Sequence, residues 1–390
     1  MYRSLTDTDR SRPPILVIGY SARMLAELAT SAGQAVTALD YFGDADLRAL
    51  CPSQSLRRDF GGQAYSAAAL TGAARTVAAG AVVYGASFEN HPELVAELAT
   101  GRRLLGNTPA TLRRVRDPLR LAAALRAGGL AFPETHPASQ PPSRDRRRWL
   151  YKPRQSGGGH AVRDWRGEDL PGAGILQERL PGLVGSVAFV ANGRRAALLG
   201  LTEQLVGRRA FGATGYRYCG NLTPPRLPAA ALAALEQQAR VVVNQVTSVF
   251  GLRGVNGLDF VWQHGQLWTL EVNPRPSAAL ELFDGEPGCV FKAHLEGCRG
   301  KLPDLPLLDP GGPTRGKAVI YAPADVVVGD TGGWAARDWR DIPHPGEMIQ
   351  RGHPICTVLA TARSGQACLT ALRRQAAAVR RELKAVEAQA

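Results

Sequence analysis

Long apolar runs are missing from this 390-residue sequence, and so is an apolar core near its first residues. No stretch of about 18 apolar residues occurs, which is roughly the length that a membrane-spanning helix needs. The opening stretch, MYRSLTDTDRSRPP, is polar and does not resemble a secretory signal. An apolar fraction of 45% and a charged fraction of 21% are typical of a globular protein. We therefore expect a cytoplasmic protein of two or three packed lobes, with no membrane partner.

Cysteine is sparse and scattered along the chain. The sequence holds six cysteines and no C-x-x-C pair, so reduced thiols are expected rather than a disulfide framework. Cys289, His294 and Cys298 lie near one another in the sequence. They fit a single helix better than a metal site.

Lysine is also rare, because five of the 47 basic residues are lysine and the others are arginine. The formal net charge is nevertheless +13, which suits nucleic acid, a membrane surface or small anionic substrates. No basic run is interleaved with stacking aromatic residues, and the densest cluster, Arg144 to Arg148, lies in a Pro/Ser-rich connection. The charge therefore predicts small anionic substrates and no nucleic-acid partner.

The first hundred residues alternate between strand-like and helix-like segments. A buried-type strand over 14–19 turns at Gly19 into a helix over 22–32, and a second strand over 35–39 ends at Asp40. This alternation predicts a parallel sheet flanked by helices, similar to a Rossmann half. The G-x-G-x-x-G fingerprint is missing after Gly19, so dinucleotide binding stays only an alternative.

The segment from Gly257 to Phe283 predicts a hairpin that carries oxygen ligands. Strand-like runs over 257–262 and 267–272 flank a polar turn that contains Gly265. If the loop has three residues, with Gly265 in the left-handed conformation, then Asp259 falls opposite Glu271 and Asn273 shares their face. A two-residue loop would instead put Asp259 on the other face. The first arrangement suits Mg²⁺ that also contacts nucleotide phosphates.

Two upstream segments supply candidate nucleotide contacts. A strand over 149–153 carries Lys152, and a loop with three glycines, 157–159, follows it. Glycine lets backbone N–H groups approach phosphate oxygens closely, and the lysine adds a point charge. No G-K-[ST] closes the loop, so it is not a Walker loop. A further strand over 175–178 ends in a turn at Gln177–Leu180.

Asp259, the Glu-Val-Asn of 271–273 and Arg275 resemble the metal-binding end of the ATP-grasp fold, as in biotin carboxylase and the carboxylate–amine ligases. The resemblance extends to the predicted ATP-dependent carboligases related to biotin carboxylase, a group associated with one-carbon cofactor metabolism in methylotrophs. It implies an α/β (α+β) chain with a Rossmann-like pre-ATP-grasp domain and a small C-terminal β-rich module with a terminal helix. The implied boundaries are 1–110, then 111–310 with a lid subdomain at about 149–195, then 311–390.

The same resemblance implies ATP and Mg²⁺ as cofactors and assigns roles to residues. Mg²⁺ is held by Asp259, Glu271 and Asn273, and Arg275 stabilises an acyl phosphate. ATP is held by residues that cover its phosphates and by an adenine hinge: Lys152, Ser156, Gly157, Gly158 and Gly159 for the phosphates, and Gln177, Glu178, Arg179 and Leu180 for the hinge.

Two positions depart from the family pattern. Pro118 stands after Asp117 where the family often has a phosphate-binding lysine, and Arg116 or Arg120 is the candidate substitute. Val184 or Gly185 stands where an acid often binds the ribose. We also expect a single helix from Thr108 or Thr111 to Arg126.

The implied activity is ATP-dependent ligation of a small-molecule carboxylate to an amine through an acyl phosphate. By analogy, the product belongs to the biosynthesis of a pterin- or furan-type cofactor. A homodimer is the commonest assembly of soluble enzymes and is our expectation here. Three alternatives stay open: a bicarbonate-using carboxylase, a dinucleotide-binding oxidoreductase and a non-catalytic nucleotide-binding protein. Ser277 and Ala279 replace the Gln and Glu of biotin carboxylase after the arginine, which disfavours the first alternative.

Overall fold

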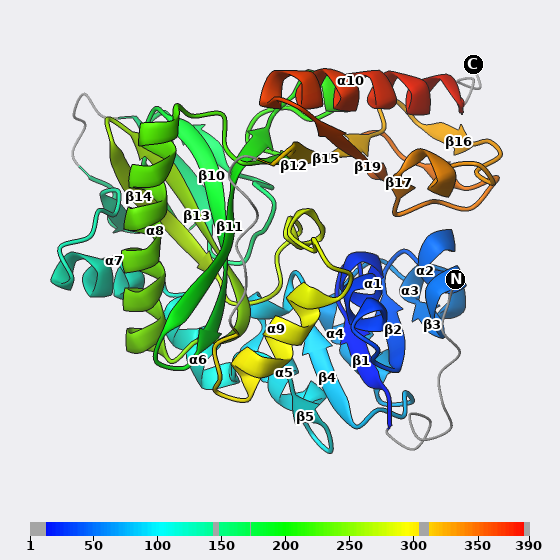
Figure 1. Ribbon diagram of the computed structural model, residues 1–390, viewed down its shortest axis with the longest axis horizontal. Helices are drawn as coiled ribbons and strands as arrows, with labels where there is room; N and C mark the ends of the chain where they lie inside the picture. The colour runs from blue at the N-terminus through cyan, green and yellow to red at the C-terminus, as the bar shows by residue number, and fades with distance from the viewer. Residues whose placement is uncertain (1–12, 143–147, 172, 304–311, 386–390) are drawn as a thin grey trace.

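The computed structural model describes residues 13–142, 148–171, 173–303 and 312–385, which form four β-sheets with helices packed between and around them (Figure 1). The predicted α/β class is confirmed. Two predicted features lie wholly or partly outside the described residues: the polar N-terminal stretch and the basic cluster at 144–148, of which only Arg148 is described.

The N-terminal sheet is parallel throughout and has the order β3-β2-β1-β4-β5. Alternate residues of β1 and β4 belong to two different core clusters, because successive side chains of a strand point to opposite faces. Both faces are therefore covered, as parallel sheets require, and the Rossmann-like prediction is confirmed. The strands are β1 (Ile15–Ile18), β2 (Val36–Asp40), β3 (Ser53–Ser55), β4 (Ala81–Tyr84) and β5 (Arg103–Leu104). The helices are α1 (Arg23–Ser31), α2 (Ala45–Leu50), α3 (Leu56–Asp59), α4 (Ala67–Ala74), η2 (Phe88–Asn90) and α5 (Pro92–Leu98).

The prediction of a single helix over 108–126 is wrong. The structure has α6 (Pro109–Val115) and α7 (Pro118–Ala127), with a break between them. Pro118 disfavours helical geometry at Asp117, so that residue leaves the helix. The Asp117 carboxylate instead caps α7, accepting from the N–H groups of Leu119 (3.0 Å) and Arg120 (3.2 Å).

A small antiparallel sheet of order β6-β9-β7-β8 carries the glycine-rich loop between β7 and β8. Trp149, Tyr151 and Leu176 form its compact core with Ala138. The strands are β6 (Thr135–Pro137), β7 (Trp149–Pro153), β8 (Arg163–Trp165) and β9 (Gly174–Glu178).

The largest sheet has eight antiparallel strands in the order β14-β13-β10-β11-β12-β15-β19-β17. Helix α8 covers one face of this sheet, and α9 lies between the other face and the N-terminal domain (Figure 1). Its strands are β10 (Leu183–Asn192), β11 (Ala196–Val206), β12 (Tyr218–Thr223), β13 (Arg253–Gln263), β14 (Gln266–Asn273), β15 (Thr314–Tyr321), β17 (Trp339–Arg340) and β19 (Pro354–Ala362). The helices beside it are η3 (Arg209–Phe211), α8 (Ala229–Phe250), η4 (Leu280–Leu282) and α9 (Cys289–Cys298).

The C-terminal part is rich in β-structure and contains a long helix near its end, as predicted, and a short strand follows that helix. Helix α10 (Gly365–Arg381) lies over β15 and β19 (Figure 1). A three-stranded sheet of order β18-β16-β20 lies beside it, with η5 nearby. These elements are β16 (Val326–Val328), η5 (Ala335–Arg337), β18 (Met348–Ile349) and β20 (Leu383–Ala385). Within the described ranges, no helix has both the length and the apolar character needed to cross a membrane.

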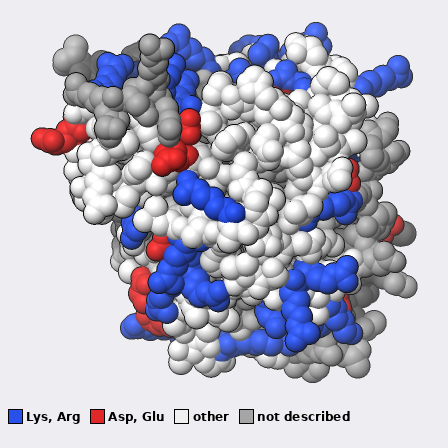
Figure 2. Space-filling model, turned by 90° about the vertical axis from the view of Figure 1, so that its left-hand side faces the viewer, with Lys and Arg blue, Asp and Glu red and all other residues white. Residues whose placement is uncertain are grey.

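The positive charge is spread over the surface that Figure 2 shows. Lys and Arg side chains occur there in separate groups with uncharged surface between them (Figure 2). On this face the charge therefore does not form one continuous stripe.

Candidate active site

One cavity of about 1430 Å³ lies among the small sheet of β6, β9, β7 and β8, the eight-stranded sheet, the N-terminal domain and the C-terminal strands. Every residue predicted for the site lines this cavity, although the predicted set spans more than a hundred positions of sequence. They are Lys152, Ser156, Gly157, Gly158, Gly159, Gln177, Glu178, Arg179, Leu180, Asp259, Glu271, Asn273 and Arg275.

The β13–β14 hairpin places two carboxylates opposite each other, but not through the predicted three-residue loop. Gln263 pairs with Gln266, so the turn has two residues, His264 and Gly265, with φ angles of +48° and +74°. The register then shifts by one residue beyond Phe260, so that Asp259 pairs with Glu271. The extra residue is Leu270, a β-bulge. The bulge restores the pairing that a two-residue turn alone would have lost.

Side-chain contacts orient the three predicted metal ligands, Asp259, Glu271 and Asn273, which together form the metal face. Asp259 Oδ1 accepts from Gln204 Nε2 at 2.8 Å, and Asp259 Oδ2 accepts from Asn273 Nδ2 at 3.1 Å. The amide nitrogen of Asn273 is thus directed to the carboxylate, which leaves its amide oxygen for another partner. Gln204 is a residue that the sequence reasoning did not assign to the site.

The electrostatics of this face fit a divalent cation. Burial, together with the nearby negative charge of Glu271, raises the pKa of Asp259 to about 8. Burial opposes ionisation of Glu271 as well, but Arg116 and Lys152 lower its pKa below the usual value. Two carboxylates and an amide oxygen held together in this way are the hard donors that Mg²⁺ prefers. Asp259, Glu271 and Asn273 therefore fit the predicted Mg²⁺ site.

Lys152 lies on β7 of the small sheet and is directed towards the metal face. Its Nζ donates to Gln177 Oε1 at 2.6 Å, so the lysine and the first hinge residue are bound together. Burial lowers the pKa of Lys152, while Glu271 and Asp259 oppose that shift. A cation on one side of the cavity thus faces carboxylates on the other.

The glycine-rich loop is packed against the loop that precedes β12. Tyr218 N–H donates to the carbonyl oxygen of Gly158 at 2.9 Å. Gly159 has a φ of +73°, and a Cβ atom there would lie 1.9 Å from the Tyr216 carbonyl oxygen. Only glycine fits this position without displacing backbone. The close approach explains the need for glycine at position 159.

The hinge at 177–180 is fixed by backbone contacts. Arg179 N–H donates to the Arg148 carbonyl oxygen at 2.7 Å, and the Arg179 guanidinium binds Asp164 at 3.2 Å. The backbone N–H of Arg179 is thus already used inside the protein. The Arg179 N–H is therefore not available to a purine edge.

Of the two candidate substitutes for the missing lysine, Arg116 lines the cavity. Its Nη1 lies 3.4 Å from Glu271 Oε2, and its Nη2 donates to Asn90 Oδ1 at 2.9 Å. The Arg120 side chain is 66% exposed and pairs with Asp117 at 3.8 Å. Pro118 and Val184, the two departures from the family pattern, both line the cavity.

Arg275 is held by a residue of the N-terminal domain. Its Nε donates to Glu89 Oε1 at 2.6 Å, and the Glu89 side chain is only 2% exposed. Burial disfavours the charged guanidinium, but Glu89 more than compensates and raises the pKa of Arg275. Sequence reasoning missed Glu89. Its position just past the carboxyl end of β4 was the available signal, since ligands of α/β sheets collect there.

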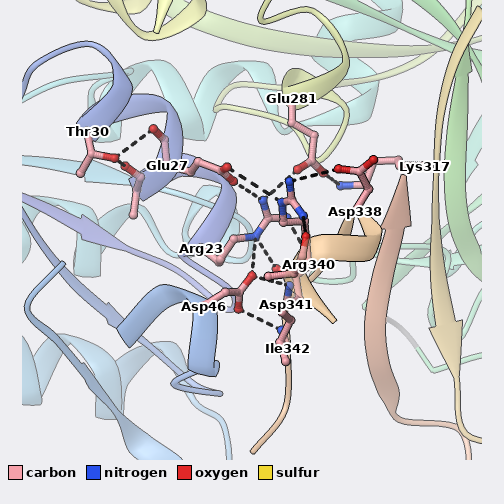
Figure 3. Close-up of polar contacts among 12 residues, drawn as sticks. Arg23, Glu27, Thr30, Asp46, Glu281, Lys317, Asp338, Arg340, Asp341 and Ile342 are labelled. Atoms are coloured by element: carbon pink, nitrogen blue, oxygen red, sulfur yellow. Dashed lines mark hydrogen bonds and ion pairs between the residues drawn. The ribbon is translucent and has the colours of Figure 1, made fainter. Parts of the chain in front are cut away.

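A second buried charge cluster joins the N-terminal domain to the C-terminal strands beside the cavity (Figure 3). Arg23 is 2% exposed and contacts Glu281 at 2.9 Å and Asp341 at 3.0 Å. Lys317 pairs with the other oxygen of Glu281. Figure 3 shows these side chains converging from α1, η4 and β15. Glu281 is therefore fully engaged by two cations.

The Cys289, His294 and Cys298 group lies on α9, as expected from sequence. The buried His294 accepts through Nδ1 from Val255 N–H at 3.0 Å. Burial lowers the pKa of His294 to about 4. In the described part of the chain, no three His, Cys, Asp or Glu side chains form a group suited to a metal.

The fold and the site together resemble those of ATP-grasp enzymes. Residues 115–279 match the family described as the ATP-grasp domain, which confirms the predicted resemblance. A comparison with curated proteins gives no match.

Solved structures with the same fold include carboxylases and a ligase. Pyruvate carboxylase of Rhizobium etli is 14% identical with a TM-score of 0.71, and the match covers 96% of this chain and 38% of that one. The biotin carboxylase domain of a single-chain bacterial carboxylase is 18% identical with a TM-score of 0.68, covering 95% and 89%. L-amino acid ligase from Bacillus licheniformis is 15% identical with a TM-score of 0.67, covering 96% and 99%. At these identities the likeness defines the fold alone.

Proposed function

We propose that the protein is an ATP-dependent carboxylate–amine ligase that forms an amide through an acyl phosphate and releases ADP. One observation carries the proposal. The carboxylates of Asp259 and Glu271 lie in the same cavity as Lys152 and Arg275, so oxygen donors for Mg²⁺ and cations for phosphate share one site. Phosphoryl transfer needs charge stabilisation and positioning more than a protein nucleophile.

Each residue then has a role in the sequence of steps. The substrate carboxylate attacks the γ-phosphate of ATP, and Lys152 and Arg275 neutralise charge that builds on the transferring oxygens. Mg²⁺ held by Asp259, Glu271 and Asn273 would add positive charge at the phosphates. The glycine-rich loop covers the phosphates and limits access of water. An amine then displaces phosphate from the acyl carbon.

The environment of Glu281 supports ligation over bicarbonate-dependent carboxylation. The family of biotin carboxylase has an acid four residues after the arginine, where this chain has Ala279. The nearest acid, Glu281, is bound by Arg23 and Lys317, with 9% of its side chain exposed. A carboxylate engaged by two cations is a poor base for bicarbonate.

The environment of Asp40 disfavours the oxidoreductase alternative. Its carboxylate is buried and accepts from the N–H groups of Ala22 (3.0 Å) and Gly43 (2.8 Å). A ribose would need this acid to be free. The complete set of Asp259, Glu271 and Asn273 likewise argues against a non-catalytic protein.

The finer assignments rest on resemblance. We propose a glutamate-type amine and a pterin- or furan-type acid in cofactor biosynthesis, a cytoplasmic location and a homodimer. We also propose the division into 1–110, 111–310 and 311–390, with the lid at about 149–195. The eight-stranded sheet continues past position 310, because β15, β17 and β19 extend it.

The test is a screen of acid–amine pairs for ADP release, with bicarbonate in place of the amine as the parallel arm. Ligation predicts ADP release that requires both an acid and an amine, together with an amide product identified by mass. ADP release that needs bicarbonate and no amine would contradict the proposal. NADH fluorescence titration tests the oxidoreductase alternative on the same preparation.

A further inference from the structure

Glu89 presents a buried carboxylate oxygen that nothing in the described residues binds. The residue belongs to η2, is 2% exposed and lines the cavity. Its Oε1 accepts from Arg275, whereas its Oε2 is buried and has no hydrogen-bond partner among the described residues. Leaving a buried charged acceptor unsatisfied is costly. Such an atom at a cavity wall is expected to meet a donor from a bound molecule.

The negative charge of the Glu89 carboxylate determines which kind of donor can bind its Oε2. ATP, a substrate carboxylate and bicarbonate are all anions, and an open carboxylate oxygen repels them. The proposed reaction has one further substrate, the amine, which is an ammonium ion at neutral pH. A carboxylate is the side chain that binds an ammonium with a charge-assisted hydrogen bond. Glu89 therefore matches the third substrate and none of the others.

Aromatic rings beside Glu89 strengthen this match. Burial, with a smaller contribution from the charge of Glu89, raises the pKa of Tyr65 to about 12. The Tyr65 ring lies 4.7 Å from that of Tyr20, and Tyr20 lies 4.9 Å from Phe42. All three rings line the cavity. Ring faces attract a desolvated ammonium ion, whereas phosphates and carboxylates gain no such attraction.

Resting on the proposed ligase activity, we propose that Glu89 Oε2 binds the ammonium of a primary amine co-substrate and accepts its proton. One N–H proton passes to Oε2, and the freed lone pair attacks the acyl carbon. The C–O bond to phosphate breaks, and its electron pair leaves with the phosphate. A second ammonium proton departs with the phosphate, so the amide nitrogen keeps one proton. Glu89 then returns its proton to water.

A purely structural role for Glu89 makes a different prediction. If Glu89 only holds Arg275, its loss disturbs acyl-phosphate formation, because Arg275 is the group proposed to stabilise that species. If Glu89 binds the amine, its loss spares acyl-phosphate formation and blocks the second step. The two steps can be separated with hydroxylamine, a nucleophile that is uncharged at neutral pH and needs no ammonium acceptor.

The experiment compares the full-length wild type, Glu89→Gln and a matched control, Glu93→Gln. The Glu93 side chain is 63% exposed and lies on the same segment. The probes are benzoate and 2-furoate as acids, with hydroxylamine, methylamine, benzylamine or L-glutamate as nucleophiles. Hydroxamate and amide are quantified separately by mass, and thermal unfolding confirms that each variant folds.

We expect Glu89→Gln to lose about 100-fold or more in amide formation, the range typical of losing a general base, while hydroxamate formation changes less than threefold. Glu93→Gln behaves as the wild type, and Glu89→Asp recovers part of the amide formation. An equal fall of both products would overturn the proposal, because it is the signature of a displaced Arg275. Unchanged amide formation would overturn it as well. Absence of hydroxamate from the wild type with every acid would refute the proposed ligase activity itself, which is a distinct result.

Discussion

Asp259 faces Glu271 across the β13–β14 ladder because one extra residue, Leu270, shifts the register of β14. The turn at His264-Gly265 alone would have placed Leu270 opposite Asp259 and Glu271 on the other face. The metal face therefore depends on a β-bulge, a device that recurs next to active sites. Because of the bulge, a two-residue turn is compatible with two carboxylates on the same face of the hairpin.

The first prediction concerns the metal face directly. Glu271→Ala should abolish ADP formation and leave the fold intact, because Glu271 lies at the cavity wall and is not part of a hydrophobic core. The loss should exceed the about 10–100-fold typical of removing a residue behind a metal ligand. ADP release and circular dichroism measure the two outcomes. The control is Glu236→Ala, an acid in a surface pair on α8. Retained turnover in Glu271→Ala would refute the assignment.

The second prediction concerns Gln204, which holds Asp259 of the metal face in place. Its amide holds Asp259 Oδ1 at 2.8 Å, so Gln204→Ala frees the carboxylate to rotate. We expect the Mg²⁺ concentration for half-maximal activity to rise by about 10–100-fold, with a smaller effect at saturating Mg²⁺. A Mg²⁺ titration of ADP release measures it. A loss of activity that excess Mg²⁺ does not relieve would show that Gln204 acts in another way.

The glycine-rich loop offers a matched pair of substitutions. Gly159→Ala forces an L-residue to a φ of +73° and brings its Cβ within 1.9 Å of the Tyr216 carbonyl oxygen. The backbone strain alone is about 1–2 kcal/mol, and each 1.4 kcal/mol corresponds to about tenfold. We expect kcat/KM for ATP to fall by at least about tenfold. In Gly157→Ala the added Cβ meets nothing within 4 Å, so this variant should lose much less activity than Gly159→Ala. Equal effects of the two would contradict the packed-loop interpretation.

The sequence was sufficient to predict those site residues that a local sequence pattern identifies. Strand alternation around the polar turn, the lysine before three glycines and the acids of the hairpin led to residues that share one cavity. The break at Pro118 also has a local signal, because proline and a capping aspartate mark the start of a new helix there.

The rest could not be predicted because it depends on tertiary packing. Glu89 and Arg275 are separated by 186 positions, and Arg23 and Asp341 by 318. Neither partner can be named until the sheets are placed relative to one another. The bulge at Leu270 likewise has no signature in the residues, since strands with and without a bulge show similar apolar patterns. Long-range charge pairs and local register shifts are therefore features that the sequence alone does not reveal.

The buried Arg23 cluster yields the last prediction, on stability. Arg23→Met leaves the carboxylates of Glu281 and Asp341 without their shared cation, which should cost about 3–5 kcal/mol at neutral pH. The control, Arg240→Met, removes an i,i+4 surface pair and should cost at most about 0.5 kcal/mol.

The pH dependence of the Arg23→Met effect follows from Asp341. Burial alone would raise the pKa of Asp341, but Arg23, with smaller contributions from Lys317 and Thr357, lowers it from 3.8 to about 2 in the folded protein. A depressed folded pKa contributes stability that is present above the unfolded pKa and is lost as the pH falls through the folded one. The gap between wild type and Arg23→Met should therefore be widest above about pH 4 and shrink toward pH 2. Urea unfolding across this range measures it, and a gap that does not change with pH would show that Arg23 stabilises the junction by packing rather than by charge.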